Sequence, residues 1–98
     1  MDRLTLKATI ISKTKAPNWG SACNTIQDVA EKVLSKKAWN RVNKAAYADY
    51  QISEGSDFVV FNGAYYDWKR FDVDKLKIIS SFLDYFNNNE LELINNNL

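Results

Sequence analysis

Residues 57–71 read DFVVFNGAYYDWKRF and hold six of the thirteen aromatic residues of this 98-residue chain. In the middle, Asn62-Gly63 separates two runs of β-branched and aromatic residues, the pattern of a hairpin with a two-residue type I′ turn. We therefore predict a hairpin over residues 57–69. The turn fixes its register, with these pairs: Phe61 and Ala64, Val60 and Tyr65, Val59 and Tyr66, Phe58 and Asp67. Both faces then carry apolar groups, so the face that does not pack on the core is either covered or meets a partner.

Two further segments alternate between apolar and polar residues. The period of two in LTLKATII, residues 4–11, is typical of a strand with one buried face, and it predicts a strand over residues 3–12. Residues 47–53 alternate less clearly and could form another strand before the turn expected at SEGS. With the hairpin, these segments would make a small antiparallel sheet.

Two stretches show helical periodicity. Apolar residues recur at helical spacing from Cys23 to Leu34, and neither Gly nor Pro interrupts residues 21–54, which predicts a kinked or two-part helix at about residues 22–46. A second helix is predicted at about residues 73–87. It should end at the run of asparagines, because their side chains compete for backbone hydrogen bonds. The tail ELELINNNL could form a short strand or a frayed end, and we expect about residues 95–98 to be mobile. The whole predicts one domain, residues 1–98, of α+β class with helices on one face of the sheet.

The residues that carry most enzyme chemistry are scarce. The chain has no histidine, which is the usual general base at neutral pH and a common metal ligand. Its single cysteine, Cys23, lies on the apolar stripe of the first predicted helix, which indicates a buried structural thiol. The carboxylates Asp67, Asp72 and Asp74 are better explained by capping and solvation than by a cation. We therefore expect no enzymatic activity, no cofactor and no metal.

The sequence also bears on location. No apolar run is long enough to span a membrane, and the N-terminal residues show no secretory signal. A single cysteine cannot form an intrachain disulfide, which fits a reducing compartment. We expect a cytoplasmic protein with no membrane partner.

The first candidate binding surface is the hairpin and the residues after it. They include residue types that are enriched at the energetic centres of interfaces, namely Tyr65, Tyr66, Trp68, Lys69 and Arg70. A partner protein could bind the open sheet face, or a second copy of the chain could bind there and form a homodimer. Packing beneath another part of the chain explains the same residues equally well. Trp19, beside Pro17, would be either a lid on the core or another anchor.

The second candidate surface is a basic run, Lys32, Lys36, Lys37, Arg41 and Lys44, with no acidic residue between Glu31 and Asp49. It belongs to an uneven distribution, because residues 1–44 carry nine basic and three acidic side chains and residues 45–98 carry four and nine. Such a run could follow the phosphates of a nucleic acid, although a solvated helix face is the simpler explanation.

These observations favour a small, non-enzymatic protein-binding module. Eleven asparagines, with abundant lysine and isoleucine, are typical of AT-rich coding sequences such as those of low-GC bacteria and their phages. The leading hypothesis is a phage or mobile-element accessory protein that binds a host protein and modulates or inhibits it. The alternative is a nucleic-acid-binding protein that uses the basic run.

Overall fold

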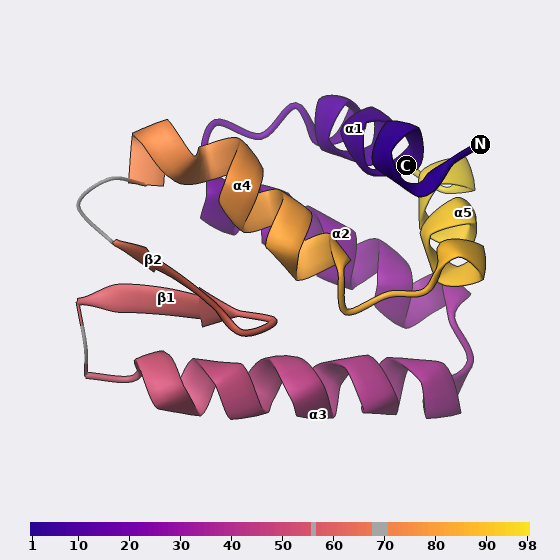
Figure 1. Ribbon diagram of the computed structural model, residues 1–98. Helices are drawn as coiled ribbons and strands as arrows, with labels where there is room; N and C mark the ends of the chain where they lie inside the picture. Colours follow the sequence, from indigo (N-terminus) through magenta and orange to yellow (C-terminus); the bar gives the residue numbers. More distant parts are fainter. Residues whose placement is uncertain (56, 68–70) are drawn as a thin grey trace.

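The computed structural model of the chain describes residues 1–55, 57–67 and 71–98 (Figure 1). Within these ranges it has five helices and one two-stranded antiparallel sheet. In chain order the elements are α1 (Arg3–Thr14), α2 (Trp19–Val33), α3 (Lys36–Ser53), β1 (Phe58–Phe61), β2 (Ala64–Asp67), α4 (Phe71–Leu83) and α5 (Asn88–Asn96). The predicted α+β class is confirmed, but most of the strands expected around the hairpin are helices.

The hairpin itself forms with the predicted register, from Phe58 opposite Asp67 to Phe61 opposite Ala64. Asn62 and Gly63 both have positive φ, 49° and 82°, as a type I′ turn requires. The first of these values is tolerated because asparagine is among the few residues that enter the left-handed region readily. A local two-residue signal thus fixed the pairing of both strands.

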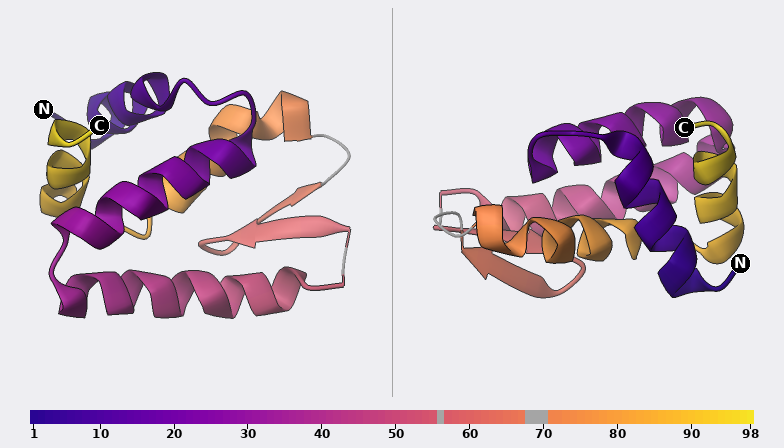
Figure 2. Two further views of the ribbon diagram at one scale, coloured as in Figure 1. Left: turned by 180° about the vertical axis from the view of Figure 1, so that it is seen from behind. Right: turned by 90° about the horizontal axis from the view of Figure 1, so that it is seen from above.

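The sheet lies between helices, with α3 on one side of the hairpin and α4 on the other (Figures 1 and 2). Val59 and Val60 point to opposite faces of β1, yet they are only 6% and 1% exposed. The expectation that helices cover one face and leave the other open is therefore wrong at this point of the hairpin. The exposed side chains on the Val60 face are Phe58, Tyr65 and Asp67.

The predicted strand at residues 3–12 is wrong, because these residues form α1. Asp2 caps the helix, and its side chain accepts a hydrogen bond from the Thr5 backbone N–H at 2.8 Å, which lowers the pKa of the Asp2 carboxyl. Leu6 and Ile10 lie one turn apart and are both buried, so α1 gains its stability by packing that stripe on α4 and α5. The burial outweighs the strand preference of the threonines and isoleucines around it.

Of the kinked or two-part helix predicted at residues 22–46, the two-part form is confirmed. The chain leaves α2 at Leu34, which has extended backbone angles, and α3 restarts at Ser35, whose hydroxyl accepts from the Ala38 N–H at 3.2 Å. The predicted strand at residues 47–53 is wrong, since α3 continues through it to Ser53. Alanines at 45, 46 and 48 favour this continuation, because alanine has the highest helix propensity.

The C-terminal part also differs from the prediction. The helix expected at residues 73–87 runs from Phe71 to Leu83, and the tail forms α5 rather than a short strand or a frayed end. Asn87 and Glu90 make a capping box, each side chain accepting the other's backbone N–H, at 2.9 and 2.8 Å. The mobility of residues 95–98 stays a prediction.

The core is built around α2, which contacts α1, α3, α4 and α5 (Figure 2). The apolar stripe predicted from Cys23 to Leu34 is largely confirmed. On α4, Ile79, Phe82 and Leu83 are buried, whereas Leu76 is 63% exposed. The buried core comprises Leu6, Ile10, Ala22, Cys23, Ile26, Ala30, Leu34, Val42, Ile79, Phe82, Leu83, Phe86, Leu91 and Ile94.

Candidate functional site

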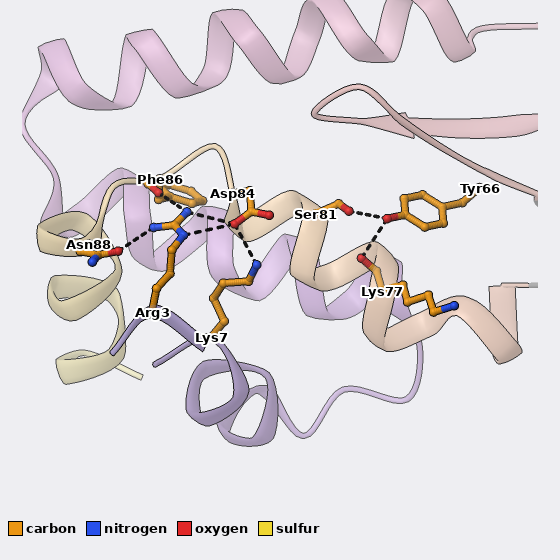
Figure 3. A network of polar contacts seen from close by, with 8 residues as sticks. All are labelled: Arg3, Lys7, Tyr66, Lys77, Ser81, Asp84, Phe86 and Asn88. Atoms are coloured by element: carbon orange, nitrogen blue, oxygen red, sulfur yellow. Dashed lines mark hydrogen bonds and ion pairs between the residues drawn. The ribbon is translucent and has the colours of Figure 1, made fainter. Parts of the chain in front are cut away.

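The hairpin candidates are divided by the structure. The hydroxyl of Tyr66 donates to the Lys77 carbonyl at 3.3 Å and shares a hydrogen bond with Ser81 Oγ, so this side chain ties β2 to α4 (Figure 3). Tyr65 is 60% exposed, and its ring packs against that of Phe58 at 5.6 Å between centroids. The other predicted residues, Trp68, Lys69 and Arg70, lie outside the described residues. Of the two predicted hairpin residues that the structure describes, Tyr65 is exposed and Tyr66 is held against α4.

The basic run lies along α3, with Lys32 at the end of α2. Arg41 forms an ion pair with Glu90, whose buried carboxylate also accepts the Asn87 N–H. Arg41 thus fastens α3 to α5 and is largely neutralised there. In the part of the chain that the structure describes, the four lysines of the run form no ion pair. These four lysines form an exposed positive patch over the end of α2 and the N-terminal half of α3.

A third surface was not predicted. Between α2, α3 and β1 lies a groove of about 600 Å³, which we call the aromatic groove. Aromatic side chains from four elements line it: Trp19, Tyr47, Tyr50, Phe61 and Phe82. Cys23, Ala46 and Val59 add apolar surface, and the polar lining comprises Asn24, Gln27, Asn43, Ser53 and Glu54.

The outer wall of the groove is a pair of tyrosines on α3. Tyr47 and Tyr50 are one turn apart, and their rings stack with centroids 6.3 Å apart and planes inclined by 23°. They are 59% and 58% exposed, and neither hydroxyl has a hydrogen-bond partner among the described residues. Nothing in the described fold requires tyrosine at these two positions.

The floor of the groove is part of the packed interior. Phe61 meets Trp19 edge to face at 5.8 Å and tilts against Phe82 at 5.5 Å. Cys23 is buried beside them, and burial raises its pKa to about 12, so the thiol stays protonated at neutral pH and is a poor nucleophile. The expected burial of Cys23 is confirmed. An aromatic floor held on several sides keeps its shape when a ligand enters.

A polar clamp sets the position of the tyrosine wall relative to the hairpin. The Asn62 N–H at the hairpin tip donates to Asp49 Oδ2 at 2.9 Å and to the Tyr85 hydroxyl oxygen at 2.8 Å. The Tyr85 hydroxyl in turn donates to Asp49, and burial together with this carboxylate raises the pKa of Tyr85 well above its usual value. Because Asp49 precedes Tyr50 on α3, the clamp fixes the width of the groove.

Three amides line the rim of the aromatic groove: Asn24 and Gln27 on α2 and Asn43 on α3. Their side chains form no hydrogen bond with any residue that the structure describes. Each amide can donate and accept at once, which suits a peptide group or any ligand with both functions. The rim can therefore orient a ligand whose apolar part enters the groove.

A shallower groove of about 650 Å³ lies between α1 and α4. Its apolar residues include Leu4 and Leu76, which are 78% and 63% exposed. Beside it, Asp84 accepts from Arg3 and Lys7 at 3.0 and 2.8 Å and ties α1 to the end of α4 (Figure 3). Tyr66 is the only aromatic residue among those that the structure describes in the lining of this groove, and its hydroxyl is engaged by α4, so this groove is the weaker candidate.

Two general searches bear on other kinds of site. Among the described residues, no cluster of three or more potential metal ligands occurs, and no helix is both long and apolar enough to cross a membrane. Comparison with models of known protein families, with curated proteins and with solved structures gave no significant match.

Proposed function

We propose that this protein is a non-enzymatic protein-binding module and that its contact surface is the aromatic groove rather than the hairpin. The observation that carries the proposal is the stacked pair Tyr47 and Tyr50, which is more than half exposed beside a groove with an aromatic floor. Tyrosine and tryptophan are the residues most enriched at the energetic centres of protein interfaces.

The shape of the groove supports binding of a side chain from a partner. Its volume of about 600 Å³ is within the range of pockets that enclose small ligands, and one large apolar side chain fills only part of it. Trp19 packs on Phe61 and also lines the groove, and this position supports a contact with the partner. Burying the exposed tyrosine rings against a partner would recover hydrophobic free energy that the free protein forgoes.

A module of this kind acts by occupying a partner's surface, without chemistry of its own. This is the mode of action expected of the accessory protein that the composition suggests, which would bind a host protein and modulate or inhibit it. The host-directed role and the cytoplasmic location stay predictions.

The test is selection from a random peptide library displayed on phage, with the purified protein as bait. We expect peptides that bind wild type and lose most of their binding to the double variant Tyr47→Ser/Tyr50→Ser. Tyr65→Ser is the matched control, since it removes an exposed tyrosine from the hairpin. Circular dichroism and thermal unfolding confirm that both variants are folded.

Peptides that bind the groove variant normally but lose binding to Tyr65→Ser would assign the interface to the hairpin instead. A library that yields no peptide sensitive to the groove variant would contradict the proposal.

Nucleic-acid binding is a second candidate, favoured by the four lysines without ion pairs on α2 and α3. If it is correct, an oligonucleotide binds with an affinity that falls steeply with salt and drops for Lys36→Gln/Lys37→Gln/Lys44→Gln. The control Lys15→Gln/Lys77→Gln removes exposed charge elsewhere. Absence of binding at low ionic strength rules this candidate out.

A further inference from the structure

We infer that the partner segment of the aromatic groove is an acidic linear peptide with one aromatic anchor, whose acidic residues lie on one side of the anchor only. This inference rests on the proposed function and names the chemistry of its partner. It follows from the way charge and aromatic surface are divided along α3.

The N-terminal half of α3 and the end of α2 are basic. Lys32, Lys36, Lys37 and Lys44 are exposed and form no ion pair with any described residue. Between Asp28 and Lys44 the exposed carboxylates are Asp28 and Glu31, so the four lysines outnumber them. Arg41 adds nothing because Glu90 neutralises it. An acidic segment is attracted to this end of the surface.

Lys36 lies along the same side of α3 as the two tyrosines. At ~100° per residue, Lys37 and Lys44 are turned by about 60–80° from Tyr47, toward the neighbouring side of the helix. Lys36 and Tyr47 are eleven residues apart, close to three full turns, and Lys44 precedes Tyr47 by about one turn. Lys44 lies about 9 Å along the helix axis from Tyr50, and Lys36 lies about 16 Å from Tyr47, at a rise of ~1.5 Å per residue. A peptide following α3 therefore meets the lysines first and the tyrosines next, or the reverse.

These spacings fix the pattern expected in the peptide. An extended chain advances about 3.3 Å per residue, so acidic residues are expected about three to five positions from the anchor. The anchor enters between Trp19 and the tyrosine pair, where its ring can stack or meet them edge to face. The rim amides of Asn24, Gln27 and Asn43 are placed to pair with peptide groups between the two.

The same division of charge argues for a peptide rather than a nucleic acid. A nucleic-acid strand carries a phosphate at every nucleotide, so it needs positive charge along its whole path. The far end of the aromatic groove instead has Glu54 in its lining, and Asp57 follows in the chain. A strand crossing the groove would bring phosphates to these carboxylates.

The test is a titration of fluorescently labelled nine-residue peptides by anisotropy. The first pair carries three glutamates centred four positions before or after one phenylalanine, with serine and glycine elsewhere. We expect one of the two to bind, because the orientation of the chain on α3 selects it. Its controls replace the phenylalanine by serine, or the glutamates by lysines, and both should bind at least about tenfold more weakly.

The protein variants locate the contacts. The double variant Tyr47→Ser/Tyr50→Ser should lower the affinity for the peptide about thirtyfold or more, as expected for aromatic residues at the energetic centre of an interface. The double variant Lys36→Gln/Lys44→Gln should lower the affinity about three- to tenfold and make it less dependent on salt. The control Lys15→Gln/Lys77→Gln should leave both the affinity and its salt dependence unchanged.

The possible outcomes distinguish failure of this inference from failure of the proposed protein-binding function. Selected peptides that depend on the tyrosine pair but carry no acidic residues overturn the inference and leave the protein-binding function standing. Equal binding of the glutamate and lysine peptides overturns it as well. If an oligothymidylate displaces the peptide and does not bind the variant Lys36→Gln/Lys44→Gln, the surface is assigned to single-stranded nucleic acid instead.

Discussion

At the scale of the residue, tyrosines of the same chain have different roles because their hydroxyls have different partners. Tyr66 was expected to face a partner, but its hydroxyl contacts Ser81 and the Lys77 carbonyl, and the side chain is committed to α4. Tyr47 and Tyr50 have no such partner among the described residues and stand on the surface. Residue type alone therefore does not separate packed from exposed tyrosines, because the partners of the hydroxyls and the exposure of the rings depend on how the helices pack.

Tyr66→Phe tests this assignment. Removing the hydroxyl leaves the ring in place and deletes its hydrogen bonds to α4, so the free energy of unfolding in urea should fall by about 1 kcal/mol. The affinity for a groove-binding peptide should be unchanged. A variant with wild-type stability and weakened peptide binding would show that Tyr66 contacts the partner instead.

At the scale of the element, the hairpin turn is the best determined feature of the fold. Gly63 has a φ of 82°, and no atom lies within 4 Å of the position that a Cβ would take. Gly63→Ala should therefore lower the free energy of unfolding by about 1–2 kcal/mol through backbone strain alone. Urea unfolding measures the change.

Gly55→Ala is the matched control for this prediction, because Gly55 has a φ of 77° and equally open space but lies outside the hairpin. Both variants should be destabilised by similar amounts. Gly63→Ala with wild-type stability would contradict the turn assignment.

The outcome for each element depends on whether its signal is local. Asn62-Gly63 determines a turn within two residues, so the register of β1 and β2 could be predicted. The alternation in residues 3–12 is compatible with either structure, and the burial of Leu6 and Ile10 against α4 and α5 decides for a helix. The sequence also holds two helix-start signals. Asp2 caps α1, but the β-branched residues that follow it favour a strand. Asn87 and Glu90 form the capping box of α5, but the run of asparagines suggests a helix end instead.

The candidate site could be predicted only in part for the same reason. The basic run can be recognised because its residues are close in sequence, and all five are exposed, although Arg41 pairs with Glu90. The aromatic groove joins residues from α2, α3, β1 and α4, and residues 47–53 had been assigned to a strand. A site assembled from four elements becomes visible only when the packing of those elements is known.

At the scale of the whole molecule, the helices cover most of the apolar surface and leave the aromatic groove open at one side. α3 carries positive charge at one end of that opening and exposed aromatic rings at the other. The polar clamp of Asp49, Asn62 and Tyr85 holds the two walls at a fixed separation. The molecule therefore presents a preformed surface, and binding should need little rearrangement.

The most direct test of this account is a two-dimensional ¹⁵N–¹H NMR titration with a peptide selected on the wild-type protein. The account predicts the largest amide shift changes around the groove, at Gly20, Asn24, Gln27, Asn43, Ala46 and Tyr47. Gly63, Tyr65 and residues 4–12 of α1 should change little. Shift changes concentrated on the hairpin turn and β2, or on the face between α1 and α4, would contradict the claim that the aromatic groove is the binding site.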